Sequence, residues 1–440
     1  MRSLYLILIS LLCQMATVQA EPEETASETA QICLSFDSAL RLGATNSAAI
    51  GEEQARLAEA KANLGITKSS RLPQISAYGR TATSGGSGLL DGRTDDQLGL
   101  EATQRVFDFG KSRLELDAAK ARLNAAGYAV ENSHNDSYFE TAFRFIEVLE
   151  AHERVEAARR VSDNFNAIVS SLPRRLELQV LTRAEASSIR AEQAVASADL
   201  IVEQLSLEMA QSELFVLTGS AAPICTVLPN ALLKLVSDET SEELESWVFS
   251  ALEYHPDLQA LEQQRQASDA ELLRQKKEQL PTLSLSGVVA YVYESDRERW
   301  EQDERLGLSL TTPLWGGGRY SNQRAQAVAR KRLAEQSFDR ARRDLHADMI
   351  VTLRRVLSGF GLSAARSEAV QNLDIEVAAI TQEFENKLRP YQDVEAAQAD
   401  LQTARLQEIE AKYDLLFYQI KLLYLTQRLR PERCCETADQ

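Results

Sequence analysis

The chain has 440 residues, and its 65 acidic side chains outnumber 48 basic ones to give a formal net charge of −17 at pH 7. So acidic a chain, with no cluster of Lys or Arg, is not expected to bind nucleic acid. Beyond residue 20 no apolar run approaches the ~20 residues that a transmembrane helix requires. Any contact with a membrane must therefore use β-strands or a surface.

The first twenty residues have the pattern of a secretory signal peptide. Arg2 precedes an apolar run over residues 4–13, and residues 18–20 (VQA) form a small-residue cleavage pattern. Lipidation of Cys13 is the alternative, but leucines precede this cysteine where small residues are needed. We therefore expect residues 1–20 to be a signal peptide for export.

A domain-sized unit occurs twice in the rest of the chain. RLPQISAYG at 71–79 aligns with QLPTLSLSG at 279–287, at an offset of 208 residues. The same offset pairs residues 95–111 with 303–319 and, far downstream, Ala196 with Ala404. Matches to one offset over such a length indicate a duplication. We expect repeat 1 over 34–219, a connector over 220–243, repeat 2 over 244–430 and a C-terminal tail over 431–440.

Four cysteines lie beyond the signal peptide. An exported chain meets an oxidising compartment, where disulfides form. Cys33 precedes repeat 1 and Cys225 lies in the connector before repeat 2. We therefore hypothesise a disulfide between Cys33 and Cys225, joining two equivalent points. Cys434 and Cys435 are interpreted as tail thiols or as partners in other bonds rather than as a metal site, because no histidine lies near them.

Each repeat is predicted to contain a β-hairpin. Residues 35–63 read as a helix, whose continuation Pro73 forbids. The hydrophobic period then changes to two, as where Leu283 and Leu285 alternate with Ser284 and Ser286. The expected strands cover about 73–84 and 96–107 in repeat 1, and about 281–293 and 303–315 in repeat 2.

Such hairpins are apolar on one face and small or polar on the other. In a soluble protein the apolar face would pack on a core, whereas in a membrane barrel it faces lipid and the polar face lines the lumen. Four strands cannot close a barrel, for which about eight is the practical minimum. If these strands contact lipid, the chain must oligomerise.

A long helical hairpin follows each pair of strands, over about 111–218 and about 319–428. Pro173 and Pro390 are expected to interrupt the two helical stretches at matching places. The first arm could reach about 90 Å at ~1.5 Å per residue. Its alanines, such as Ala118 and Ala121, lie on several faces of the helix, which predicts close packing on both sides rather than a single apolar stripe.

The duplicated order of helix, strand hairpin and helical hairpin, with the turn VFDFG at 106–110, resembles the TolC family of outer-membrane channel proteins. The resemblance covers essentially the whole mature chain. It implies a mainly α protein with membrane β-structure: a homotrimer whose 12-stranded β-barrel in the outer membrane of a Gram-negative bacterium continues into a periplasmic α-helical barrel.

The function implied is a passive exit duct that contacts outer-membrane lipid. A periplasmic adaptor (membrane fusion protein) and an inner-membrane pump would serve it, and the adaptor would engage the hairpin ends near 172–185 and 380–393. Both drug or small-molecule efflux and type I protein secretion stay open, with the VFDFG turn and the connector cysteine favouring secretion. The alternative function is a soluble periplasmic coiled-coil scaffold or adaptor.

The resemblance also implies a gate at the hairpin ends. Arg389 and Glu185 occupy the positions of a charged pair that holds the family's tunnel shut, and Asp393 that of an acidic ring at the entrance. A second family acid is Ala396 here, so this entrance carries one ring. Without the resemblance these charges read as ordinary solvated helix ends.

Two positions of the hairpin ends depart from the family's pattern. Gln179 and Lys387 stand where the family has glycines. Because glycine permits the positive φ angles that Gln and Lys resist, the resemblance leaves the backbone conformation of these turns open.

We expect neither an enzyme nor a cofactor. The four histidines are not spaced from one another or from a cysteine as a zinc motif requires, and WGGGR at 315–319 lacks the Lys-Ser/Thr of a phosphate loop. Aromatic residues gather instead at strand ends and loops, where an interfacial girdle and ordinary packing are equally open interpretations. They are Tyr78, Phe107, Tyr291, Tyr293, Trp300 and Trp315.

Overall fold

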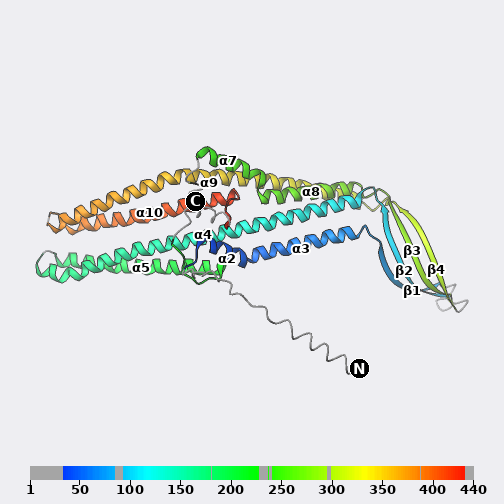
Figure 1. Cartoon of the computed structure of the whole chain (residues 1–440), viewed down its shortest axis with the longest axis horizontal. Coiled ribbons are helices and arrows are strands. Elements are labelled where there is room, and N and C mark those ends of the chain that lie inside the picture. Colours follow the sequence, from blue (N-terminus) through cyan, green and yellow to red (C-terminus); the bar gives the residue numbers. More distant parts are fainter. Residues whose placement is uncertain are drawn as a thin grey trace, which may run out of the picture.

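The computed structural model is an elongated molecule in which helices run along most of the length and a β-sheet lies at one end (Figure 1). The structure describes residues 33–84, 93–179, 181–226, 236, 240–294, 299–386 and 388–431. Among the described residues, no helix combines the length and apolar character of a membrane span.

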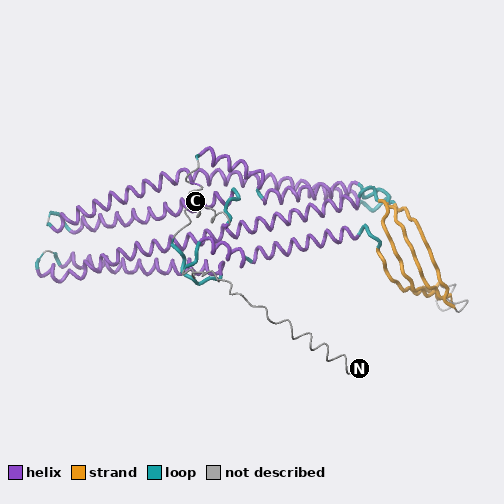
Figure 2. The backbone as a smooth tube through the Cα atoms, in the orientation of Figure 1, coloured by secondary structure: helices purple, strands orange, loops and turns teal. Residues whose placement is uncertain are grey.

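The elements follow the same order twice (Figure 2). The first half contains α2 (Phe36–Asn46), α3 (Ala48–Ser69), β1 (Gln74–Ser84), β2 (Arg93–Phe107), α4 (Lys111–Glu177) and α5 (Arg183–Thr218). The second half contains α7 (Ser241–Tyr254), α8 (Pro256–Lys276), β3 (Thr282–Glu294), β4 (Arg299–Thr311), α9 (Arg319–Glu385) and α10 (Tyr391–Leu425).

The duplication is visible in the backbone. α4 and α9 each have 67 residues and begin at equivalent positions. Immediately before them, Gly110 and Gly318 adopt left-handed conformations with φ angles of 82° and 84°. A side chain is strained at such angles, so glycine is the residue that lets the chain turn into each long helix.

The helix expected over 35–63 is two helices. α2 ends at Asn46 because Ser47 has an extended backbone, with φ −67° and ψ 114°. The Ser47 side chain accepts a hydrogen bond from the N–H of Ile50 and caps α3, which continues to Ser69. A serine that offers its oxygen to nearby backbone N–H groups favours such a cap over a helix interior.

The expected interruption at Pro173 is wrong, whereas the one at Pro390 is confirmed. Pro173 lies inside α4, which continues to Glu177. A proline this close to a C-terminus removes one backbone hydrogen bond, and the remaining turn still closes. Pro390 instead precedes the first residue of α10 in an extended conformation.

The four strands form one antiparallel sheet in the order β1-β2-β3-β4, so β2 and β3 join the two halves. β4 differs most from the prediction, since it begins and ends four residues earlier than 303–315. Its pairing with β3 ends where Thr311 lies opposite Thr282. Pro313 follows, and a proline has no N–H with which to continue the ladder.

The largest core lies at the middle of the molecule, where α2 and α7 pack on the long helices (Figure 1). Phe36 of α2 meets Phe145 of α4 edge to face, with ring centroids 5.4 Å apart. On α7, Leu244 and Trp247 are buried in the same core. α2 packs on α4 and α5 of its own half and α7 on α8 and α9 of its own half, while α4 and α10 join the two halves.

α4 contacts neighbours on several sides, as its small residues predict. It packs against α2, α3, α5, α8 and α10. Ala118, Ala119, Ala121 and Ala125 are buried in these contacts. Because α8 also packs on α9, the two halves are joined along the helices as well as through the sheet.

The predicted disulfide between Cys33 and Cys225 is confirmed, with 5.0 Å between the two Cα atoms. Next to it the N–H of Leu34 donates to the carbonyl of Pro223 at 2.7 Å, and the N–H of Cys225 donates to the carbonyl of Leu34 at 2.9 Å. The disulfide therefore attaches the segment before α2 to the connector.

Several predictions fall on residues outside the described ranges. They concern the signal peptide at 1–20, most of the connector after residue 226, Lys387, and the tail with Cys434 and Cys435.

The packing of α2 on α4 can be tested at Gly43. A Cβ atom there would overlap the hydroxyl of buried Thr141 and lie 3.0 Å from its Cβ and Cγ2 atoms. We expect Gly43→Ala to lower the free energy of unfolding by about 1–3 kcal/mol through overpacking. The control is Gly51→Ala in α3, where a Cβ meets nothing within 4 Å. Because alanine favours a helix interior more than glycine does, the free energy of unfolding should rise there by about 0.5–1 kcal/mol. Thermal unfolding followed by circular dichroism distinguishes the two, and equal effects would contradict this packing.

Candidate functional site

The ends of the two helical hairpins lie at the end of the molecule opposite the sheet (Figure 1). The sequence places Glu185 just after the α4–α5 turn, and Arg389 and Asp393 around the α9–α10 turn. These charges and the residues packed beneath them form the candidate site.

At the first hairpin end, Glu185 takes part in a capping box with Thr182. The Thr182 hydroxyl accepts the N–H of Glu185 at 3.2 Å, and the Glu185 carboxylate accepts the N–H of Thr182 at 2.8 Å. This pattern satisfies two backbone donors that α5 would otherwise leave unpaired. Glu185 thus stabilises the start of its own helix.

Gln179 takes the positive φ expected of the family's glycine. It follows Leu178, the C-cap residue of α4, and has φ 53°, in the left-handed region. The turn therefore keeps the glycine-type conformation with a residue that is strained in it.

At the second hairpin end, Arg389 binds acids of its own hairpin. Its Nε lies 2.6 Å from the carboxylate of Glu383, and its Nη1 lies 3.5 Å from that of Asp393. All three side chains are between two fifths and half exposed. The structure thus brings Arg389 and Asp393 together. In the described part of this single chain it gives Arg389 no ion pair with Glu185.

A small apolar core joins the two hairpins beneath these charges. Leu172 and Ile189 of the first hairpin are buried together with Tyr391 and Val394 of the second. Tyr391 is 3% exposed and meets Phe384 edge to face, with centroids 5.7 Å apart. Tyr391 was not predicted as a site residue from the sequence. The signal at this position is an aromatic side chain directly after Pro390, the residue that precedes α10.

The Tyr391 hydroxyl is buried and has no hydrogen-bond partner among the described residues. Burial, and then the negative charges of Glu395 and Glu192, raise the pKa of Tyr391 to about 12. The phenol is therefore neutral at physiological pH and keeps a donor that no described residue accepts.

The sheet at the other end of the molecule has two different faces. Residues directly opposite in the ladder share a face, so Ser76, Glu101, Val288 and Arg305 lie together on the mainly polar one. The other face is mainly apolar, with Thr81, Asp96, Gln302 and Glu304 as polar members near one end. Its exposed apolar residues are Ile75, Leu98, Leu100, Val289, Tyr291, Leu306, Leu308 and Leu310.

Tryptophans flank this apolar face along β4. Trp300 near the start of the strand packs against Tyr293, with ring centroids 5.5 Å apart, and is half exposed. Trp315, four residues beyond the end of β4, is 86% exposed. Within the described part of the single chain, packing thus covers Trp300 in part and Trp315 scarcely at all.

The fold and the two ends of the molecule define a class: an elongated, duplicated helical protein with an uncovered four-stranded sheet. The family model described as "Outer membrane efflux protein" matches residues 40–220 and 247–426, which correspond to the two repeats. The chain therefore belongs to the outer membrane efflux protein family, and it is an outer-membrane protein of Gram-negative bacteria.

Individual relatives agree with this assignment. The chain is 23% identical to the outer membrane efflux protein BepC of Brucella suis over 90% of this chain and 84% of that protein. It is 22% identical to the outer membrane protein TolC of Salmonella enteritidis, over 81% of this chain and 74% of that protein. Among solved structures, a membrane protein from Pseudomonas aeruginosa has a TM-score of 0.80 at 16% identity, covering 89% of this chain and 92% of that one.

The strain at Gln179 can be measured locally. We expect Gln179→Gly to stabilise the last turn of α4 by about 1 kcal/mol, since glycine adopts positive φ without strain. Hydrogen exchange of the amides at residues 175–179 should slow about fivefold. As a control, Gln204→Gly inside α5 should speed local exchange, because glycine weakens a helix interior. Faster exchange in Gln179→Gly would show that the turn is unstrained.

Proposed function

We propose that three copies of the chain form a passive duct across the outer membrane and periplasm, the exit of a tripartite efflux or type I secretion system. The observation that carries this proposal is the sheet. It has four strands, an exposed apolar face and two unpaired edges, β1 and β4. An exposed edge and a bare apolar face are not stable in water. Three such sheets joined edge to edge give a 12-stranded barrel, which pairs the open edges, and lipid around the barrel covers the apolar face.

The dimensions of the sheet suit a bilayer. β4 has 13 residues, and at ~3.3 Å per residue and a ~45° tilt it covers about 30 Å of membrane thickness. Trp300 and Trp315 would then lie near the two interfaces, which favours the girdle interpretation of these aromatic residues. The polar face, with Glu101 and Arg305, would line the lumen.

α5 supplies the second support for a trimer. Val202, Leu205, Met209 and Val216 are all more than half exposed in the single chain. Their spacing of three, four and seven residues is that of a coiled-coil seam. α9 carries further exposed apolar residues, such as Leu333 and Ile375. Helices of neighbouring copies would cover these residues and form the walls of a tunnel below the barrel.

α4 and α9, with 67 residues each, are about 100 Å long at ~1.5 Å per residue, enough to cross much of a periplasm. A pump in the inner membrane and a periplasmic adaptor would meet the duct at the hairpin ends, near 172–185 and 380–393. Membership of the family favours this duct over a soluble periplasmic scaffold. The family's role is transport, and the duct itself performs no chemistry.

Arg389 and Asp393 are proposed to set the resting state of the entrance. Three Asp393 carboxylates converging on one axis would raise the local negative potential and favour cations. Arg389 lies between Asp393 and Glu383 and partly neutralises this ring. Glu185 would act by keeping the start of α5 capped through its hydrogen bonds with Thr182.

The α5 seam predicts a surface mutation that separates the copies. We expect Met209→Glu to reduce the trimer to smaller species, because the side chain is 57% exposed in one chain but would be buried between copies. The helical content should stay unchanged. The control is Gln204→Glu, on the opposite side of α5. Light scattering of the detergent-purified protein gives the mass, and an intact trimer in Met209→Glu would contradict the seam.

The proposed gate predicts a leak. We expect Arg389→Ala to raise the resting open probability in a planar bilayer, because Asp393 and Glu383 lose their common partner. Exposed ion pairs contribute about 0–1 kcal/mol. If each copy loses up to about 1 kcal/mol in total, three copies together allow the open probability to rise up to about 100-fold. Arg366→Ala, which removes a hydrogen bond to Gln407 further along the same hairpin, is the control. Unchanged conductance in a folded Arg389→Ala trimer would remove Arg389 from the gate.

A further inference from the structure

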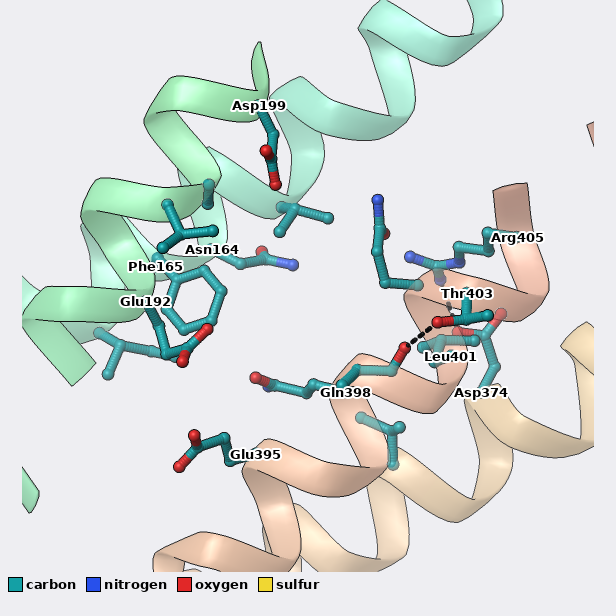
Figure 3. A pocket seen from close by; sticks show the side chains of 17 residues that line it. Asn164, Phe165, Glu192, Asp199, Asp374, Glu395, Gln398, Leu401, Thr403 and Arg405 are labelled. Atoms are coloured by element: carbon teal, nitrogen blue, oxygen red, sulfur yellow. Dashed lines mark hydrogen bonds and ion pairs between the residues drawn. The ribbon is translucent and has the colours of Figure 1, made fainter. Parts of the chain in front are cut away.

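A groove of about 500 Å³ runs between the two helical hairpins, a few helical turns from their ends. α4 and α5 form one side of this inter-hairpin groove, and α9 and α10 form the other (Figure 3). Its volume lies in the range of sites for small organic molecules. The duct function described above gives this groove no role.

About half of the groove lining is apolar. Val161, Phe165 and Ile168 line it from α4, Val195 from α5 and Val377 from α9. Figure 3 shows the Phe165 ring at the α4–α5 side, beside the carboxylate of Glu192. An aromatic ring next to a carboxylate is a combination that attracts organic ammonium groups, through the ring face and through charge.

The polar groups of the groove are mainly acidic. Glu192 and Asp199 come from α5 and Glu395 from α10 (Figure 3). None of the three has a hydrogen bond or ion pair within the described ranges of the chain. Arg405 also lines the groove, but its guanidinium is 2.6 Å from the carboxylate of Asp374. The groove therefore presents uncompensated negative charge from both hairpins.

We propose that the inter-hairpin groove binds an amphiphilic organic cation, an alkyl- or arylammonium compound. Its cationic group would lie between Glu192 and Glu395 and against the Phe165 ring, and its apolar body would cover Ile168, Val195 and Val377. A hard metal ion would gain nothing from these apolar walls. An anion would be repelled by the three carboxylates. The bound cation would link α5 to α10 and so hold the two hairpins of one copy together.

The test is equilibrium binding to the full-length protein in lipid nanodiscs, with empty nanodiscs as the blank. The probe is rhodamine 6G, a cationic xanthene dye, compared with fluorescein, an anionic dye of the same ring system. We expect saturable binding of rhodamine 6G by fluorescence anisotropy and none of fluorescein. Because no adaptor, pump or ion flow is involved, failure here leaves the duct function untouched.

Four variants locate the site. Glu192→Gln combined with Glu395→Gln should weaken binding about tenfold or more, as expected for two partly exposed charge contacts. Val195→Arg, at a position more than half exposed, should abolish binding by placing a cation in the groove, without disturbing a core. Asp163→Asn combined with Glu203→Gln removes two charges outside the groove and should change little.

Asp393→Asn, the fourth variant, separates the groove from the acidic entrance and should leave binding intact. Three results would overturn the proposal: no saturable binding, equal weakening by the Asp163 and Glu203 control, or loss of binding in Asp393→Asn with retention in the Glu192 and Glu395 variant. If the double carboxylate variant is not recovered as folded protein, Val195→Arg decides the question. Full affinity in Val195→Arg would then exclude the groove.

Discussion

The unpaired edges of the four-stranded sheet are the constraint on which the rest of the structure depends. Each repeat supplies one hairpin, and β2 and β3 pair across the repeats, so one chain completes four strands and leaves β1 and β4 open. Backbone donors and acceptors along such edges need partners, most of all in lipid, where water cannot supply them. When β4 of one copy pairs with β1 of the next, every strand gains a hydrogen-bonded neighbour on both sides only if the copies form a closed ring.

The long helices connect the sheet to the rest of the molecule. Gly110 and Gly318 let the chain turn into α4 and α9 shortly after β2 and β4. In the proposed trimer, the arrangement of strands around the barrel would therefore set the arrangement of helices around the tunnel. Small residues such as Ala118 allow α4 to have neighbours on several sides. At mid-length, the core around Phe36 and Phe145 and the Cys33–Cys225 disulfide fasten the short helices and the connector to the long ones.

The sequence predicts the parts of the fold that repeat. The period-two alternation predicted the strands, and the constant offset of 208 residues indicated that the long helical hairpin occurs twice. The parts that the pattern did not predict depend on local backbone hydrogen bonding. Ser47 caps a new helix, and Pro173 is tolerated in the last turns of α4. At the candidate site, Arg389 and Asp393 are close together as their spacing suggests. The role of Tyr391 and the capping of α5 by Glu185 depend on three-dimensional contacts that neither periodicity nor resemblance reveals.

Electron cryomicroscopy of the detergent-purified protein would count the strands and the copies in one measurement. We expect threefold particles with a closed barrel of twelve strands, in which β4 of each copy pairs with β1 of the next. Below the barrel, α5 of each copy should contact a neighbour through Val202 and Met209. A monomer whose sheet edges remain open, or a ring with another number of copies, would contradict this expectation.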